Sequence, residues 1–141
     1  MILKKHPQFN YYDPVNQMYD GEFANLAIFL TGDAFPIGYW FHFLENDGYK
    51  TVMADSTRVM KTEDNRIIIS ARWGFDDPDE DPMPFTITTD NFRQILDTWA
   101  QLIKQEVDEI TITQDKNGLV VLKGKSIGIV SKCKSLYKPF F

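Results

Sequence analysis

The stretch FTITTDNFRQILDTWAQLIKQ, residues 85–105, decides the fold that we expect for this chain. Its first residues alternate between apolar and polar types, which predicts a strand with Phe85 and Ile87 facing the core. After this strand the apolar residues recur with helical spacing and form one stripe. The stripe consists of Phe92, Ile95, Leu96, Trp99, Leu102 and Ile103. The sequence therefore predicts a strand that leads into one long amphipathic helix over about residues 89–105.

Both ends of this helix carry suitable residues. Thr88 or Thr89 can accept hydrogen bonds from the free amides at the helix start. Asp90 lies at the positive end of the helix dipole, and Lys104 lies near the negative end. The charges therefore favour the same helix boundaries as the apolar stripe does.

A β-hairpin over residues 109–123 is expected to follow the helix. A two-residue turn would place Lys123 opposite Ile112, on the core face. A three-residue turn places Leu122 opposite Ile112 and leaves Gly118 in the left-handed position of the turn. We expect the second register because it keeps the apolar side chains on one face.

Other segments are expected to be shorter. Residues 1–20 contain two prolines and several Asn, Asp and Tyr residues, and are expected to be irregular. An ordered element is expected over residues 22–30, and strands over residues 49–54, 66–73 and 126–132. The aromatic run in residues 36–46 suits either a helix or a strand. Helical spacing of Tyr39, Trp40, Phe43 and Leu44 favours a short helix.

These elements indicate an α+β fold: an antiparallel or mixed sheet, one long amphipathic helix packed on a face, and a C-terminal β-hairpin. A length of 141 residues fits a single domain over residues 1–141. Cys133 is the only cysteine, which suits a reducing compartment. The first residues, MILKKHP, lack the apolar core of a signal peptide, and no apolar run suits a membrane span. We therefore expect a cytoplasmic protein without a membrane segment.

The net charge of −5 is unevenly distributed. Up to Asp115 there are 20 acidic and nine basic residues, a sum of −11, whereas residues 116–141 carry six lysines and no acid. An acidic body favours basic partners and repels nucleic acid. The alternative reading is that both signs only solvate the surface.

The clearest candidate site is the acidic, proline-rich segment DDPDEDPMP at residues 76–84. Its prolines exclude a helix interior or a central strand. Its carboxylates can dock on the basic groove of a nuclease, or they can be merely solvated. They can also bind calcium, although the spacing lacks the Gly and the terminal Glu of a known calcium loop. Two aromatic residues just before it are either core residues or binding anchors. The predicted partner-binding residues are Trp73, Phe75, Asp76, Asp77, Asp79, Glu80 and Asp81.

Signals for catalysis or a cofactor are weak. His42 lies among aromatic residues, where a packed histidine with a hydrogen-bond partner is expected more often than a catalytic base. Two histidines and one cysteine cannot form a typical zinc site without carboxylates. The sequence therefore predicts no catalytic residues, no metal site and no cofactor.

Three segments together resemble a pattern in small bacterial immunity proteins, including those of contact-dependent growth inhibition systems. They are FTITTDNF at 85–92, ILDTW at 95–99 and EITIT at 109–113. In that pattern a short strand leads to a helix with a late tryptophan, followed by a strand rich in Ile and Thr. The resemblance covers roughly the C-terminal third of the chain, and its motifs specify a scaffold. It implies a cytoplasmic protein that binds a cognate toxin domain, often a nuclease, through residues that vary with the toxin.

We therefore expect a non-enzymatic immunity protein that neutralises a toxin domain, expected to be a nuclease, through an acidic surface. One alternative is a nucleic-acid-binding module that uses the lysines between residues 116 and 138 together with Tyr137, Phe140 and Phe141. Lysines that guard an edge strand against aggregation explain the same pattern, and the acidic body opposes polyanions. Another alternative is an enzyme built around His42 and nearby carboxylates.

Overall fold

A computed structural model describes residues 1–15, 18–19, 21–72 and 83–126 of the chain. Within these ranges the fold is α+β, with three helices and two antiparallel sheets. The elements in chain order are β1 (Ile2–Lys5), β2 (Tyr12–Pro14), α1 (Ala24–Gly32), α2 (Ile37–Glu45), β3 (Thr51–Met53), β4 (Thr57–Lys61), β5 (Arg66–Ala71), β6 (Phe85–Thr88), α3 (Thr89–Gln105), β7 (Glu109–Gln114) and β8 (Val120–Lys125).

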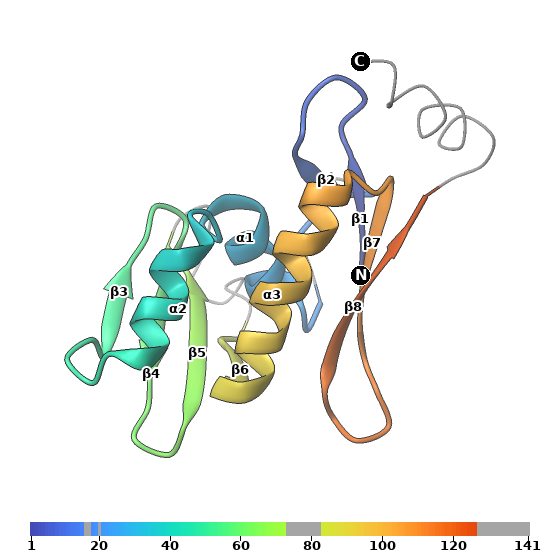
Figure 1. The fold of residues 1–141 in the computed structure, drawn as a ribbon. Helices are drawn as coiled ribbons and strands as arrows, with labels where there is room; N and C mark the ends of the chain where they lie inside the picture. Colours follow the sequence, from blue (N-terminus) through green and yellow to red (C-terminus); the bar gives the residue numbers. More distant parts are fainter. Residues whose placement is uncertain (16–17, 20, 73–82, 127–141) are drawn as a thin grey trace.

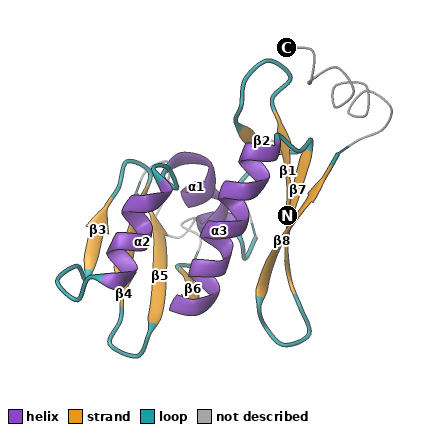
Figure 2. Ribbon diagram, viewed as in Figure 1, coloured by secondary structure: helices purple, strands orange, loops and turns teal. Residues whose placement is uncertain are grey.

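The strands form two sheets of four instead of the single sheet that we expected. The strand orders are β2-β1-β7-β8 and β3-β4-β5-β6, and every strand pair is antiparallel. Figure 1 shows one sheet on each side of the molecule, with α1 and α3 between them. Figure 2 shows the same arrangement by element type. The helix after β6 therefore separates the two sheets as well as covering one of them.

The expectation of an irregular segment over residues 1–20 is wrong for residues 2–5 and 12–14, which form β1 and β2. β1 pairs with both β2 and β7, and the amide of Ile112 donates to the carbonyl of Met1 over 2.8 Å. Leu3 and Tyr12 from these two strands are buried in the core. Both strands are short, so pairing of β1 with β7, and of β2 with β1, stabilises them more than any local signal does.

The helix α3 and the following hairpin are as the sequence predicted. Thr88 accepts a hydrogen bond from the amide of Asn91 at 3.2 Å, so Thr88 is the N-cap. In the hairpin Ile112 lies opposite Leu122, and Gly118 has a φ of 83°. The register with the three-residue turn is therefore confirmed.

Residues 37–45 form a helix, in agreement with the favoured alternative. Trp40 and Phe43 are buried, whereas Tyr39 is exposed and does not belong to the buried stripe. β4 was not predicted, because its sequence TRVMK carries few apolar residues. The strand expected over residues 126–132 lies outside the described residues apart from Ser126.

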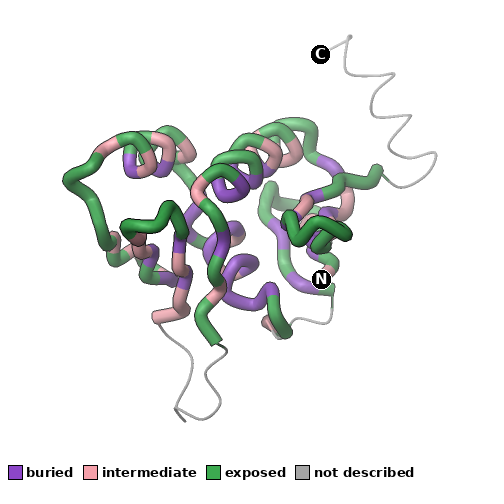
Figure 3. The backbone as a smooth tube through the Cα atoms, turned by 90° about the horizontal axis from the view of Figure 1, so that it is seen from below, coloured by how far each residue is buried: buried purple, intermediate pink, exposed green. Residues whose placement is uncertain are grey.

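The core fills the space around the helices. Phe29 of α1 contacts the rings of Trp40 and Phe92, at centroid distances of 4.9 and 5.4 Å, so all three helices meet there. Figure 3 shows that α2 and α3 turn their exposed residues outward and their buried residues inward. Each sheet places alternate residues in this core and the others on an outer face.

Candidate partner-binding site

The predicted partner-binding residues, Trp73 to Asp81, lie outside the described residues. The structure does describe the chain on both sides of them, up to Arg72 and from Met83. Arg72 directly follows β5, Met83 and Pro84 precede β6, and these strands are paired up to Ile69 and Phe85. The chain therefore leaves β5 and enters β6 at the same end of one sheet.

A buried side chain connects the chain just before residues 73–82 with the chain just after them. Asn25 of α1 accepts a hydrogen bond from the amide of Ala71 at 3.1 Å. Its amide nitrogen donates to the carbonyl of Met83 at 2.8 Å. Asn25 is only 2% exposed, so these hydrogen bonds compete little with water. We call this pair of hydrogen bonds the Asn25 bridge.

The chain that leaves β5 at Arg72 has further contacts. The amide of Arg72 donates to the carbonyl of Ser56 at 2.9 Å, and its guanidinium donates to the carbonyl of Ala54. Asp33 at the end of α1 accepts hydrogen bonds from the amide of Ser56 and the hydroxyl of Thr57. The carboxylate of Asp33 is buried and has a structural role at this end of the sheet.

The strand after the acidic segment leaves one edge without a strand partner. The amide of Thr89 donates to the carbonyl of Asn65 at 2.9 Å. Hydrogen-bonded pairs alternate along an antiparallel ladder, so Ile67 and Ile87 form the next such pair. The N–H and C=O of Thr86 therefore point away from β5. Because β6 is the last strand of its sheet, no described strand satisfies these groups.

A groove of about 420 Å³ runs along this free edge. One wall is β6, and the other is the turn of the β7–β8 hairpin. It is lined by Glu22, Phe23, Arg66, residues 84–88, Asn91, Gln114 and residues 117–120. The rings of Phe23 and Phe85 are 6.1 Å apart, whereas Arg66 lies opposite Thr88. We call this feature the β6 groove; Glu22 marks its Phe85 end and Arg66 its Thr88 end.

Asn91 holds the second wall of the β6 groove in place. Its side chain donates to the carbonyl of Val120 at 3.0 Å and accepts from the amide of Val120 at 2.9 Å. Asn91 is 3% exposed. The Asn91 side chain thus makes the two hydrogen bonds to the backbone of Val120 that a further strand beside β8 would otherwise make.

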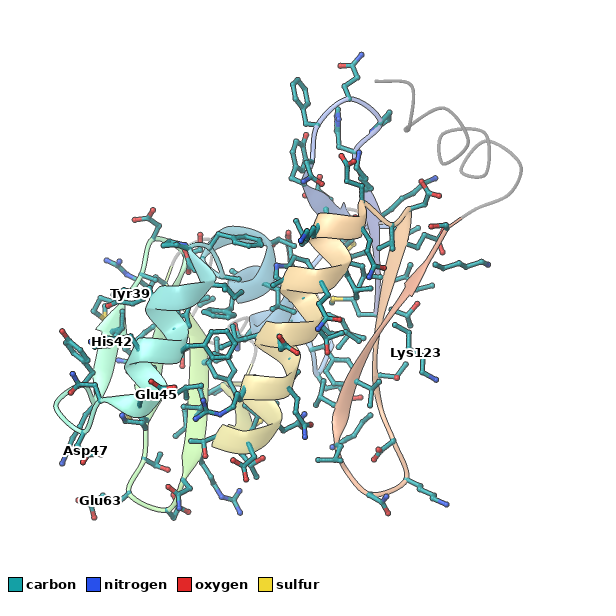
Figure 4. All side chains as sticks on the ribbon, in the orientation of Figure 1. Tyr39, His42, Glu45, Asp47, Glu63 and Lys123 are labelled. Atoms are coloured by element: carbon teal, nitrogen blue, oxygen red, sulfur yellow. The ribbon has the colours of Figure 1, made fainter. Side chains whose placement is uncertain are left out.

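The outer side of α2 presents a different polar surface. Figure 4 shows Tyr39 and His42 on the side of α2 that faces away from α3. The expectation that His42 packs in the core is wrong, because its side chain is exposed. The expected hydrogen-bond partner is present, since the side-chain amide of Asn46 lies 3.5 Å from His42 Nε2, and the ring centroid of His42 lies 5.9 Å from that of Tyr49. The nearby acids are partly neutralised by ion pairs. Glu45 Oε1 lies 3.7 Å from Arg93 Nη1, and Glu63 Oε1 lies 3.9 Å from Lys50 Nζ.

The described residues contain little that resembles catalytic machinery. Among them, no group of three His, Cys, Asp or Glu side chains could hold a metal ion. Burial, followed by the carboxylates of Asp108 and Glu106, raises the pKa of Tyr12 to about 12. The hydroxyl of Tyr12 donates to the carbonyl of Val107, so this shift accompanies a structural hydrogen bond.

Three of the six lysines in the predicted nucleic-acid surface belong to the described residues. Figure 4 shows Lys123 on the side of β8 that faces away from α3. Lys123 lies opposite Thr111, and Lys125 lies opposite Glu109. The two lysines therefore share the outer face of the sheet with an acidic residue.

Sequence reasoning missed the two buried asparagines and the β6 groove. An isolated Asn has no sequence pattern that separates a buried bridge from a turn residue. The free edge of β6 depends on strand order, which the sequence does not specify. Only Pro84, directly before β6, fits an edge strand by its residue type.

None of the helices in the described ranges is both long and apolar enough to cross a membrane. Comparisons of the chain with protein-family models, with curated proteins and with solved structures gave no match.

Proposed function

We propose that this chain is a non-enzymatic binding protein that neutralises a basic toxin domain, in the manner of a bacterial immunity protein. The acidic residues at positions 76–81 supply the charge complementarity. The observation that carries this proposal is the Asn25 bridge, which joins Ala71 and Met83, on either side of the acidic residues, through a buried side chain. The bridge holds the chain on both sides of these residues at one end of the sheet.

Electrostatics support a basic partner. Five acids within six residues give a strong local field, which accelerates encounter with a positively charged surface. The basic groove of a nuclease is such a surface, because it binds phosphates. The acidic segment then occupies the place of the nucleic acid and blocks the active site.

The test uses the protein encoded by the neighbouring reading frame, which the proposal predicts to end in a basic toxin domain. Coexpression of the two proteins should restore growth, and calorimetry should give a one-to-one complex. Replacing Asp76, Asp77, Asp79, Glu80 and Asp81 with Asn or Gln should weaken binding about tenfold or more and flatten its salt dependence.

A matched control changes acids at the other end of the same sheet. Asp47 lies in the loop between α2 and β3, and Glu63 lies in the turn between β4 and β5, whereas residues 76–81 come between β5 and β6 in the chain. Replacing Asp47 and Glu63 with amides should leave the affinity within about twofold, since salt screens exposed charges that lie away from the contact. Equal losses in the two variants would contradict a role for the acidic segment. Turnover of a nucleic acid or another substrate by the purified chain would overturn the proposal as a whole.

A further inference from the structure

We propose that the β6 groove binds an extended segment of a partner protein, which adds to β6 as a further strand. The inference rests on the proposed function only in that the chain acts by binding another protein. It concerns a different part of the surface from the acidic segment, so the two proposals can fail separately.

The first argument is that the outer edge of β6 has no strand partner among the described residues. The N–H and C=O of Thr86 point into the groove, and the N–H of Thr88 does so as well, because Thr88 and Arg66 are a non-hydrogen-bonded pair. An extended chain carries donors and acceptors that repeat every second residue, about 7 Å apart. A peptide backbone therefore matches this edge better than an isolated polar group does.

The second argument is the shape of the site. The hairpin turn stands opposite β6, with Leu119 42% exposed on that wall. Neighbouring strands lie about 4.8 Å apart, so one extended chain fits between two such walls. A second folded copy of this protein would bring its whole sheet to the edge, and the hairpin turn stands in its path.

The third argument is charge complementarity, which gives the segment a direction. Glu22 lies at the Phe85 end of the groove, and Arg66 lies at the Thr88 end. Arg66 is partly neutralised by Asp64, whose carboxylate lies 3.4 Å from the Arg66 guanidinium. A segment with a basic side chain near Glu22 fits best, and an acidic side chain near Arg66 adds less.

The test begins with a phage library of short random peptides, selected against the full chain. A selected peptide, made synthetically, serves as the probe. We expect the peptide to protect the Thr86 and Thr88 amides from hydrogen exchange. The Ile87 amide, which already bonds to β5, should be protected in the free protein too. This alternation identifies strand addition, because binding elsewhere on the surface would not produce it.

Variants of the two walls test the site independently. Leu119→Trp fills the groove from the hairpin side and leaves β6 unchanged, and Thr86→Pro removes the edge N–H. Each should weaken peptide binding about tenfold or more. The matched controls Leu119→Met and Thr86→Val should bind within about twofold of the wild type, since both keep the edge backbone. If Thr86→Pro does not fold, Leu119→Trp and the exchange pattern still decide.

Three outcomes would overturn the inference. The library yields no peptide that binds, the selected peptides protect other amides, or Leu119→Trp binds them as the wild type does. Protection of Thr86 that rises with protein concentration, together with dimers in ultracentrifugation, would identify a second copy as the occupant and also overturn it. Loss of toxin binding in the acidic-segment variant but not in Leu119→Trp would leave the proposed function standing without the groove.

Discussion

The strongest structural prediction concerns Asn91, which joins the start of α3 to the edge of β8. Asn91→Ala removes both hydrogen bonds to Val120, whose N–H and C=O are then left without partners. Val120 is 6% exposed, so water replaces these bonds poorly. Each unsatisfied buried group costs about 1–3 kcal/mol. The greater helix propensity of Ala offsets roughly 0.6 kcal/mol.

The expected loss in the free energy of unfolding is therefore about 1.4–5.4 kcal/mol. Urea unfolding followed by tryptophan fluorescence measures this loss. With an m-value of about 2 kcal/mol per molar urea, the midpoint should fall by roughly 0.7–2.7 M. The control is Gln94→Ala on the exposed side of the same helix, which should stay within about 0.5 kcal/mol of the wild type.

Asn91→Asp provides a second test of the same hydrogen bonds. The carboxylate can still accept from the Val120 amide, but it cannot donate to the Val120 carbonyl. Burial disfavours its charged form, so the pKa of the new carboxyl in the folded state should lie above its unfolded value. The protonated form is then favoured by folding, so the stability of this variant should rise as the pH falls. A loss below about 0.5 kcal/mol in Asn91→Ala, or an Asn91→Asp variant as stable as the wild type at neutral pH, would refute the bridge.

Further predictions use the same unfolding assay. The pKa of Tyr12 is raised from 10.0 to about 12, so the contribution of Tyr12 to stability is complete below pH 10 and is lost as the pH rises towards 12. Tyr12→Phe should flatten this decline in stability. An unchanged profile of stability against pH would contradict the prediction. Gly124→Ala should cost about 1 kcal/mol, because the new Cβ would lie 3.2 Å from both methyl groups of the buried Val107 and would displace the end of the Leu102 side chain. Gly38→Ala, inside α2 and in open space, should instead add about 0.5–1 kcal/mol; two variants of the same sign would refute the packing argument. Lys61→Met should cost about 1–2 kcal/mol, since the ammonium of Lys61 donates to the carbonyls of Phe43 and Asn46 at 2.9 and 2.6 Å. An unfolding midpoint equal to that of the wild type would show that water replaces these hydrogen bonds.

The parts of the fold that the sequence predicted well have local causes. The stripe of α3, its cap at Thr88 and the register that pairs Ile112 with Leu122 all depend on residues near one another in the chain. Helical periodicity and turn chemistry act over a few residues, so they can be read without knowledge of the neighbouring elements.

The missed elements have causes far away in the sequence. β1 becomes a strand because β7, about a hundred residues later, supplies its partner, and β1 in turn pairs with β2. His42 and Trp40 share one aromatic run, yet packing against α1 buries Trp40 and leaves His42 outside. A helix-or-strand pattern does not specify which face a short aromatic helix presents to the core.

The candidate site divides in the same way. The sequence alone determined the acidic segment, because charge and proline content are properties of composition. Tertiary structure decided that Asn25 joins Ala71 to Met83 and that Asn91 satisfies β8. It also decided that β6 has no neighbouring strand on one side within the described residues. The physical reason is that a hydrogen bond between distant segments depends on which elements become neighbours, and chain order does not fix that choice.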